Sequence, residues 1–108
     1  MRPPIIVDDD GDISVFPSVE TAARYMEPID VRGSEYVAYD STGRRLRLVA
    51  TDPSVTISGY DLDLPLAQDL DRALRSFVVA ATGAPVPQEL ATLDQLLAYF
   101  VNRFGYTT

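Results

Sequence analysis

The chain has 108 residues and a formal net charge of −7, and it contains no His, Cys, Lys or Trp. It therefore lacks an imidazole base, a thiolate nucleophile, a Schiff-base amine and a thiolate metal site, and we expect no enzyme, no metal and no cofactor. The acidic balance predicts repulsion from nucleic acids and anionic membranes, and attraction to a basic protein partner. The plain alternative is an acidic surface that only keeps the protein soluble.

Length and apolar content predict a single domain over residues 1–108. Apolar residues make up 46% of the chain, which is enough for one hydrophobic core in a chain of this size. No apolar run approaches the roughly 18–20 residues of a membrane span, and Ile5-Ile6-Val7 is not the hydrophobic region of a signal peptide. With no cysteine available for disulfides, we expect the protein in the reducing cytoplasm.

The first half of the chain is typical of β-strands around one short helix. The acidic turn at residues 8–12 contains Asp-Gly between two apolar runs, which is a hairpin signal. Ser18 is a suitable N-cap for a helix that Pro28 ends, and Ile29 and Val31 are expected to return to the core. The predicted helix covers residues 18–26, and the predicted strands cover residues 4–8, 12–16, 35–40, 44–50 and 55–60.

The second half of the chain is predicted to be helical. Apolar residues recur at helical spacing over residues 66–82 and 90–104, Gly83 is suited to end the first of these helices, and Thr92 with Gln95 forms a capping box. Strands early and helices late predict an α+β fold in the order ββ-α-βββ-αα. We expect an antiparallel sheet of about five strands with helices packed on one face.

The acidic turn is the first candidate for a site. An EF-hand loop with Gly11 at its sixth position would place Ile6 first and Pro17 twelfth, and neither can supply the required ligand. We therefore predict a hairpin tip whose carboxylates lie in water, and not a calcium site.

Asp61 and Asp63 form the second acidic candidate. In an extended segment their side chains share one side, so they could act as an acid and a base if one of them were buried. Their alternation with Leu62 and Leu64 favours instead the polar side of a half-exposed strand.

Arginines interrupt the acidic chain at residues 44–47. Arg45 and Arg47 share one face of a predicted strand and could grip a carboxylate or a phosphate. Pairing of these arginines across the sheet with Glu35 or Asp40, in a hairpin with one face in water, is the simpler expectation.

Tyrosines are the remaining candidates for contact with a partner. Tyrosine offers a large contact area at low entropic cost and is enriched at interfaces, although half of the six tyrosines could simply cap the core. We predict that the partner-binding residues lie at tips and strand faces. They are Asp8, Asp9, Asp10, Asp12, Tyr36, Tyr39, Asp61 and Asp63.

Three stretches within about residues 1–50 carry a resemblance to known proteins. They are Ser-Val-Glu-Thr-Ala-Ala-Arg-Tyr-Met-Glu-Pro-Ile-Asp-Val at residues 18–31, Glu-Tyr-Val-Ala-Tyr-Asp at 35–40 and Gly-Arg-Arg-Leu-Arg-Leu at 43–48. This pattern resembles small acidic uncharacterised bacterial proteins, some of which resemble toxin-immunity proteins. The resemblance implies a cytoplasmic protein that binds and blocks a cognate toxin, and it implies no catalytic residue.

The sequence thus predicts a non-catalytic protein-binding domain, an immunity-type inhibitor of a toxin such as a basic nuclease. The first alternative is a small-molecule-binding or regulatory module, with a homodimer through the C-terminal helix as one form. The second is a carboxylate enzyme at Asp61 and Asp63, which would need two acids in one cleft with different pKa values.

Overall fold

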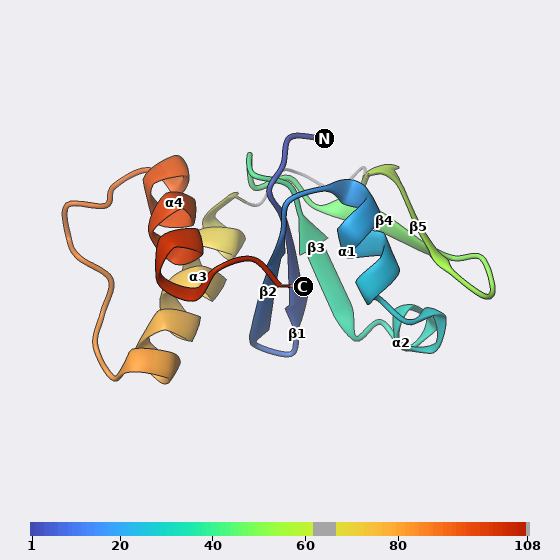
Figure 1. Cartoon of the computed structure of the whole chain (residues 1–108), viewed down its shortest axis with the longest axis horizontal. Helices are drawn as coiled ribbons and strands as arrows, with labels where there is room; N and C mark the ends of the chain where they lie inside the picture. Colours follow the sequence, from blue (N-terminus) through green and yellow to red (C-terminus); the bar gives the residue numbers. More distant parts are fainter. Residues whose placement is uncertain (62–66, 108) are drawn as a thin grey trace.

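The computed structural model describes residues 1–61 and 67–107 (Figure 1). Its strands are β1 (Ile5–Asp9), β2 (Asp12–Phe16), β3 (Tyr36–Tyr39), β4 (Leu46–Ala50) and β5 (Val55–Tyr60). Its helices are α1 (Val19–Tyr25), α2 (Pro28–Arg32), α3 (Ala67–Thr82) and α4 (Leu93–Phe104). The predicted α+β class and five antiparallel strands are confirmed for this part of the chain. No helix in the described ranges is long and apolar enough to cross a membrane.

The strands form two antiparallel sheets where a single sheet was expected. One sheet has the order β2-β1-β3 and the other pairs β4 with β5. The predicted hairpin between residues 35–40 and 44–50 is therefore wrong, because Tyr39 and Arg45 meet only in an isolated bridge before the strands diverge. β4 forms its hairpin with the strand that follows it.

Helix α2 was not predicted, and it packs against β4. Pro28 does end α1, but it also occupies the first turn of α2, where its fixed φ and missing N–H cost nothing. Val31 is half-buried and packs on the core as expected. The expectation that Ile29 returns to the core is wrong, since its side chain is 69% exposed on the outer side of this short helix.

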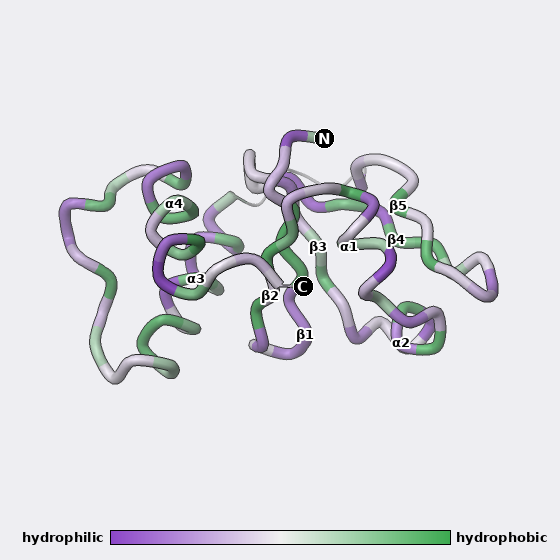
Figure 2. Tube along the Cα trace, in the orientation of Figure 1, coloured by the Kyte–Doolittle hydropathy of each residue, from purple (hydrophilic) through white to green (hydrophobic). Residues whose placement is uncertain are grey.

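The central sheet is covered on both faces. One face packs against α3 and α4, as predicted, but the other packs against α1 and the β4–β5 hairpin, so the helices do not all lie on one face as expected (Figure 1). The sheet contributes Ile6, Ile13, Val15 and Tyr39 to the first face, and Ile5, Val7, Phe16 and Ala38 to the second. Figure 2 shows the result along β1 and β2, which are hydrophobic through the middle of the molecule and hydrophilic at the turn between them.

Capping boxes begin two of the helices. In α4, Thr92 accepts a hydrogen bond from the Gln95 backbone, and the Gln95 side chain accepts one from the Thr92 backbone, as predicted. In α1, Ser18 and Thr21 form the same reciprocal pair. These bonds satisfy N–H groups that a helix start otherwise leaves without partners.

The buried carboxylate of Asp40 joins three segments of the chain. Its Oδ1 accepts hydrogen bonds from the Thr42 N–H at 3.0 Å, the Thr42 hydroxyl at 2.5 Å and the Arg44 N–H at 3.3 Å. Its Oδ2 accepts from the Arg2 N–H at 3.2 Å and the Tyr60 hydroxyl at 2.5 Å. The carboxylate thus holds the start of the chain and the end of β5 against the loop after β3.

The arginines near this loop do not form the predicted ion pairs. The Arg44 guanidinium lies over the Tyr60 ring, 3.7 Å from its centroid, while only its backbone reaches Asp40. Within the described residues, neither Arg45 nor Arg47 forms an ion pair. The reason is the divergence of the sheets, which removes the cross-strand neighbours that a β3–β4 hairpin would have supplied.

Candidate functional site

The acidic turn between β1 and β2 projects from one end of the central sheet. The Asp8 carboxylate accepts a hydrogen bond from the Gly11 N–H at 2.8 Å and so closes the turn. Asp10 and Gly11 take the left-handed conformations, with φ of 50° and 92°, that such tight turns require. The predicted hairpin is confirmed, and the carboxylates of Asp10 and Asp12 are exposed as expected, whereas Asp8 and Asp9 are half-buried.

Strand pairing brings a second acidic segment beside this turn. Asp9 pairs with Asp12 on one side and with Tyr36 on the other. Glu35, the residue before β3, consequently lies across from the turn. Between the two segments is a hollow of about 670 Å³, lined by Asp8, Asp9, Asp10, Gly11, Ser34, Glu35 and Val37.

Asp30 on α2 completes the acidic segment. A hydrogen bond with the Asp30 carboxyl, and then the charge of Asp30, raise the pKa of Glu35 above its ordinary value. The Tyr36 hydroxyl donates to Asp30 Oδ2 at 3.1 Å. Burial chiefly, with Asp30 adding to it, raises the pKa of Tyr36 to about 12. Asp30 is therefore close enough to Glu35 to disfavour the ionisation of Glu35.

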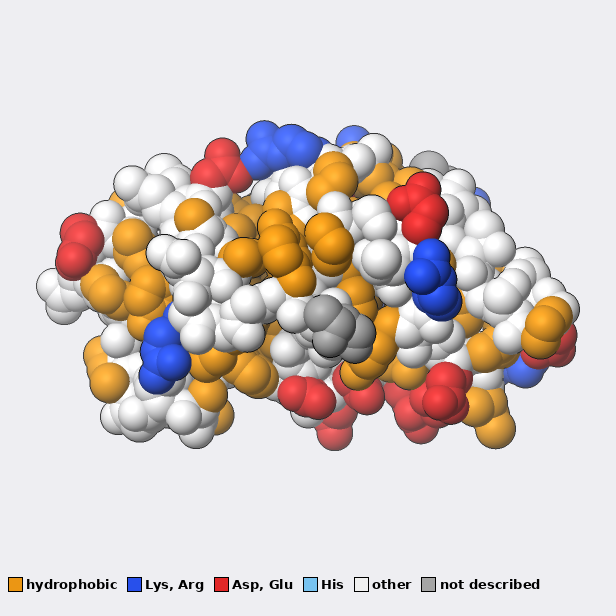
Figure 3. All heavy atoms as spheres, viewed as in Figure 1, with side chains coloured by type: hydrophobic (Ala, Val, Ile, Leu, Met, Phe, Trp, Pro, Cys, Tyr) orange, Lys and Arg blue, Asp and Glu red, His pale blue; other side chains and the backbone are white. Residues whose placement is uncertain are grey.

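We define the acidic face as the six carboxylates of Asp8, Asp9, Asp10, Asp12, Asp30 and Glu35. Figure 3 shows acidic side chains gathered along the lower edge of this view, below the central sheet and α2. None of the six forms an ion pair with an arginine in the described part of the chain. Nor does any group of three or more acidic side chains among the described residues have the placement to hold a metal ion.

The two tyrosines predicted to contact a partner are not exposed on a strand face. Tyr39 is only 6% exposed and packs in the core beneath α3 and α4, so its prediction as a contact is wrong. Tyr36 points to the other face of the sheet, where it is half-buried against the second core cluster. Alternation along β3 cannot place either ring in water, because both faces of the sheet are covered.

Of the second acidic candidate, Asp61 does not belong to the acidic face, but the hollow that it lines shares Ser34 and Val37 with the hollow of that face. Asp61 follows β5, donates its N–H to the Arg45 carbonyl at 3.0 Å, and lines a different hollow where the two sheets diverge. Asp63 lies outside the described residues.

Comparison with protein-family models, curated proteins and solved structures finds no match for this chain.

Proposed function

We propose that this chain is a non-catalytic protein-binding domain whose acidic face binds a basic surface of a partner protein. The observation that supports this proposal is the convergence of six carboxylates from residues 8–12 and 30–35, none of which pairs with an arginine; Arg32, within the second segment, pairs with Asp52 instead. A hydrogen bond with Asp30 chiefly, and then the charges of Asp30 and Asp9, raise the pKa of Glu35, and these charges reflect repulsion between the carboxylates. An approaching cationic surface relieves that repulsion and is steered toward the face by its field.

The form of this function that the sequence resemblance implies is an immunity-type inhibitor of a toxin in the cytoplasm. A nuclease grips phosphates with a basic surface. A protein of net charge −7 with six carboxylates on one face is complementary to such a surface. We therefore favour a basic nuclease toxin as the partner. The absence of His, Cys and Lys supports a role that needs no chemical step.

The proposal is tested by capture and then by association kinetics. The tagged protein is used to capture binders from its host at low and high salt, and the binder is identified by mass spectrometry and purified. Its association is then followed by stopped flow for the triple variant D10N/D12N/E35Q, which changes three exposed positions of the acidic face. The matched control is E20Q/E89Q/D94N, which removes the same charge from exposed positions away from the acidic face; Asp52 is left in place because it pairs with Arg32, beside Asp30.

At low salt we expect the face variant to slow association by about tenfold and to flatten its salt dependence, because steering depends on the local field. The control variant is expected to change the rate much less. Equal effects of the two variants would show that only net charge matters. No effect of either would remove the acidic face from the mechanism.

A further inference from the structure

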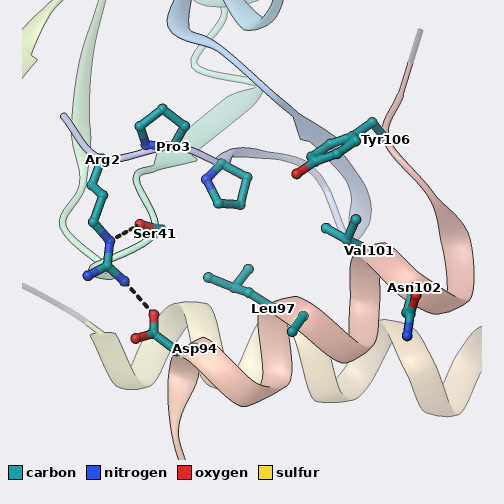
Figure 4. Close-up of a pocket in the computed structure, with 10 residues that line it drawn as sticks. Arg2, Pro3, Ser41, Asp94, Leu97, Val101, Asn102 and Tyr106 are labelled. Atoms are coloured by element: carbon teal, nitrogen blue, oxygen red, sulfur yellow. Dashed lines mark hydrogen bonds and ion pairs between the residues drawn. The ribbon is translucent and has the colours of Figure 1, made fainter.

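A second surface lies at the opposite end of β1 from the acidic face. It is a hollow of about 480 Å³ between α4 and the segment that precedes β1 (Figure 4). Its walls are apolar: Pro3 and Pro4 stand on one side, Leu97 and Val101 of α4 on the other. The Tyr106 ring closes one end, with its hydroxyl turned toward the hollow (Figure 4).

The other end of this groove carries a fixed pair of opposite charges. The Arg2 Nε donates to the Ser41 hydroxyl at 2.7 Å, and Nη2 donates to Asp94 Oδ1. The guanidinium is thus held at two points and keeps further N–H groups for a ligand, while the second oxygen of Asp94 can accept. The Arg2 and Asp94 side chains are 56% and 70% exposed, so a ligand can reach both.

We infer that this groove binds an extended apolar peptide segment. A peptide group offers one acceptor and one donor, which matches Arg2 and Asp94 together. A free carboxylate would be attracted by Arg2 but repelled by Asp94, and a free ammonium would meet the reverse, so the neutral group is the complementary one. An apolar side chain of the peptide would pack against Ala98 and Val101 of α4, beside Leu97, which is only 3% exposed.

Three probes that share one side chain test the charge argument. They are N-acetyl-leucine N-methylamide, which is neutral, N-acetyl-leucinate, which is anionic, and leucine N-methylamide, which is cationic. Each is titrated into the whole protein, and backbone amide shifts are followed by NMR. We expect saturable shifts at Leu97, Val101 and Tyr106, with the neutral probe binding about two- to fivefold more tightly than either ion, the size of an exposed charge interaction.

A charge variant makes the test sharper. Asp94→Asn leaves Arg2 without its counter-charge, so the preference is expected to move to the anionic probe by a similar factor. The control is Asp52→Asn, which breaks the Arg32–Asp52 pair of nearly equal exposure away from the groove, and it should leave the order of the probes unchanged. Asp94 is exposed on the first turn of α4, so its replacement preserves the fold.

Four results would overturn the inference. Shifts that do not saturate, or equal affinity for the three probes, would show that the groove does not select a neutral peptide group. An unchanged order of probes in Asp94→Asn would show that the Arg2–Asp94 pair takes no part. Hexanamide binding as tightly as the neutral leucine probe would assign the groove to small amides and not to a peptide. None of these results depends on the acidic face.

Discussion

Replacing Asp40 by Asn is expected to lower the free energy of unfolding by about 3 kcal/mol at pH 7. The amide oxygen can keep the Oδ1 position, but an NH₂ group then stands where Oδ2 accepted from the Arg2 N–H and the Tyr60 hydroxyl. The hydroxyl can rotate and accept, whereas the Arg2 N–H is left facing another donor. One orphaned donor costs about 1–3 kcal/mol, and the remaining bonds lose the extra strength that a charged acceptor confers.

The effect should also depend on pH in a defined direction. Burial by itself would raise the pKa of Asp40, but hydrogen bonds from Thr42 and Tyr60 and from the Arg2 and Thr42 backbones outweigh it, so the pKa lies below its ordinary value. The folded protein then holds the proton less tightly than the unfolded chain. The stabilisation from the charge is complete above the unfolded pKa of about 4 and is lost as the pH falls through the folded pKa.

Urea unfolding of wild type and variant between pH 3 and pH 7 measures the loss of free energy of unfolding and its dependence on pH. A loss of about 3 kcal/mol corresponds to a fall in melting temperature of about 12–24 °C for a domain of this size. The difference in free energy of unfolding between wild type and Asp40→Asn should become smaller below about pH 4. Tyr60→Phe serves as the matched control because it removes only one of the bonds. A loss under about 1 kcal/mol at pH 7, or a gap that is constant with pH, would refute the reasoning.

Three further substitutions probe the fold and the acidic face. Gly43→Ala should cost about 3 kcal/mol, because Gly43 has a φ of 84° and a new Cβ would lie 2.6 Å from the Ala67 Cα; Gly11→Ala, with a φ of 92° and open space around it, should cost only about 1 kcal/mol. Equal losses in urea unfolding would show that the close approach of Gly43 to α3 is unimportant. Asp30→Asn should lower the pKa of both Glu35 and Tyr36, because it removes the neighbouring charge. Side-chain NMR titration measures both pKa values. An unchanged pKa of Glu35 would contradict the proximity of the Asp30 and Glu35 carboxyls.

Local signals in the sequence were sufficient for most helices and strands. The capping box at Thr92 and the helical stripe after it placed α4, and the Asp-Gly turn placed the β1–β2 hairpin. The division into two sheets could not be predicted in the same way. Residues 35–40 and 44–50 alternate correctly for a hairpin, but β4 pairs with β5 and packs against α2, and neither contact is local to those two segments.

Only part of the acidic face could be predicted from the sequence. The carboxylates of residues 8–12 are adjacent in the chain, so their clustering is local. Asp30 and Glu35 join them only through the register of β1 with β3, which pairs Asp9 with Tyr36. That register pairs residues that are far apart in the chain, so no local sequence pattern predicts it. The same register, with both faces of the sheet covered, buries Tyr39, which alternation alone had placed on an exposed face.

The two proposed surfaces follow from the position of β1 in the fold. β1 pairs on both sides and is covered above and below, so its middle residues, Ile5 to Val7, are almost fully buried. Polar side chains can therefore reach water only at the two ends of β1. The segment before β1 supplies Arg2 and the apolar wall of the groove, and the turn after β1 supplies the carboxylates of the acidic face. Because one rigid strand separates the surfaces, a partner on the acidic face would leave the groove open, and the two binding tests can be carried out independently on the same protein.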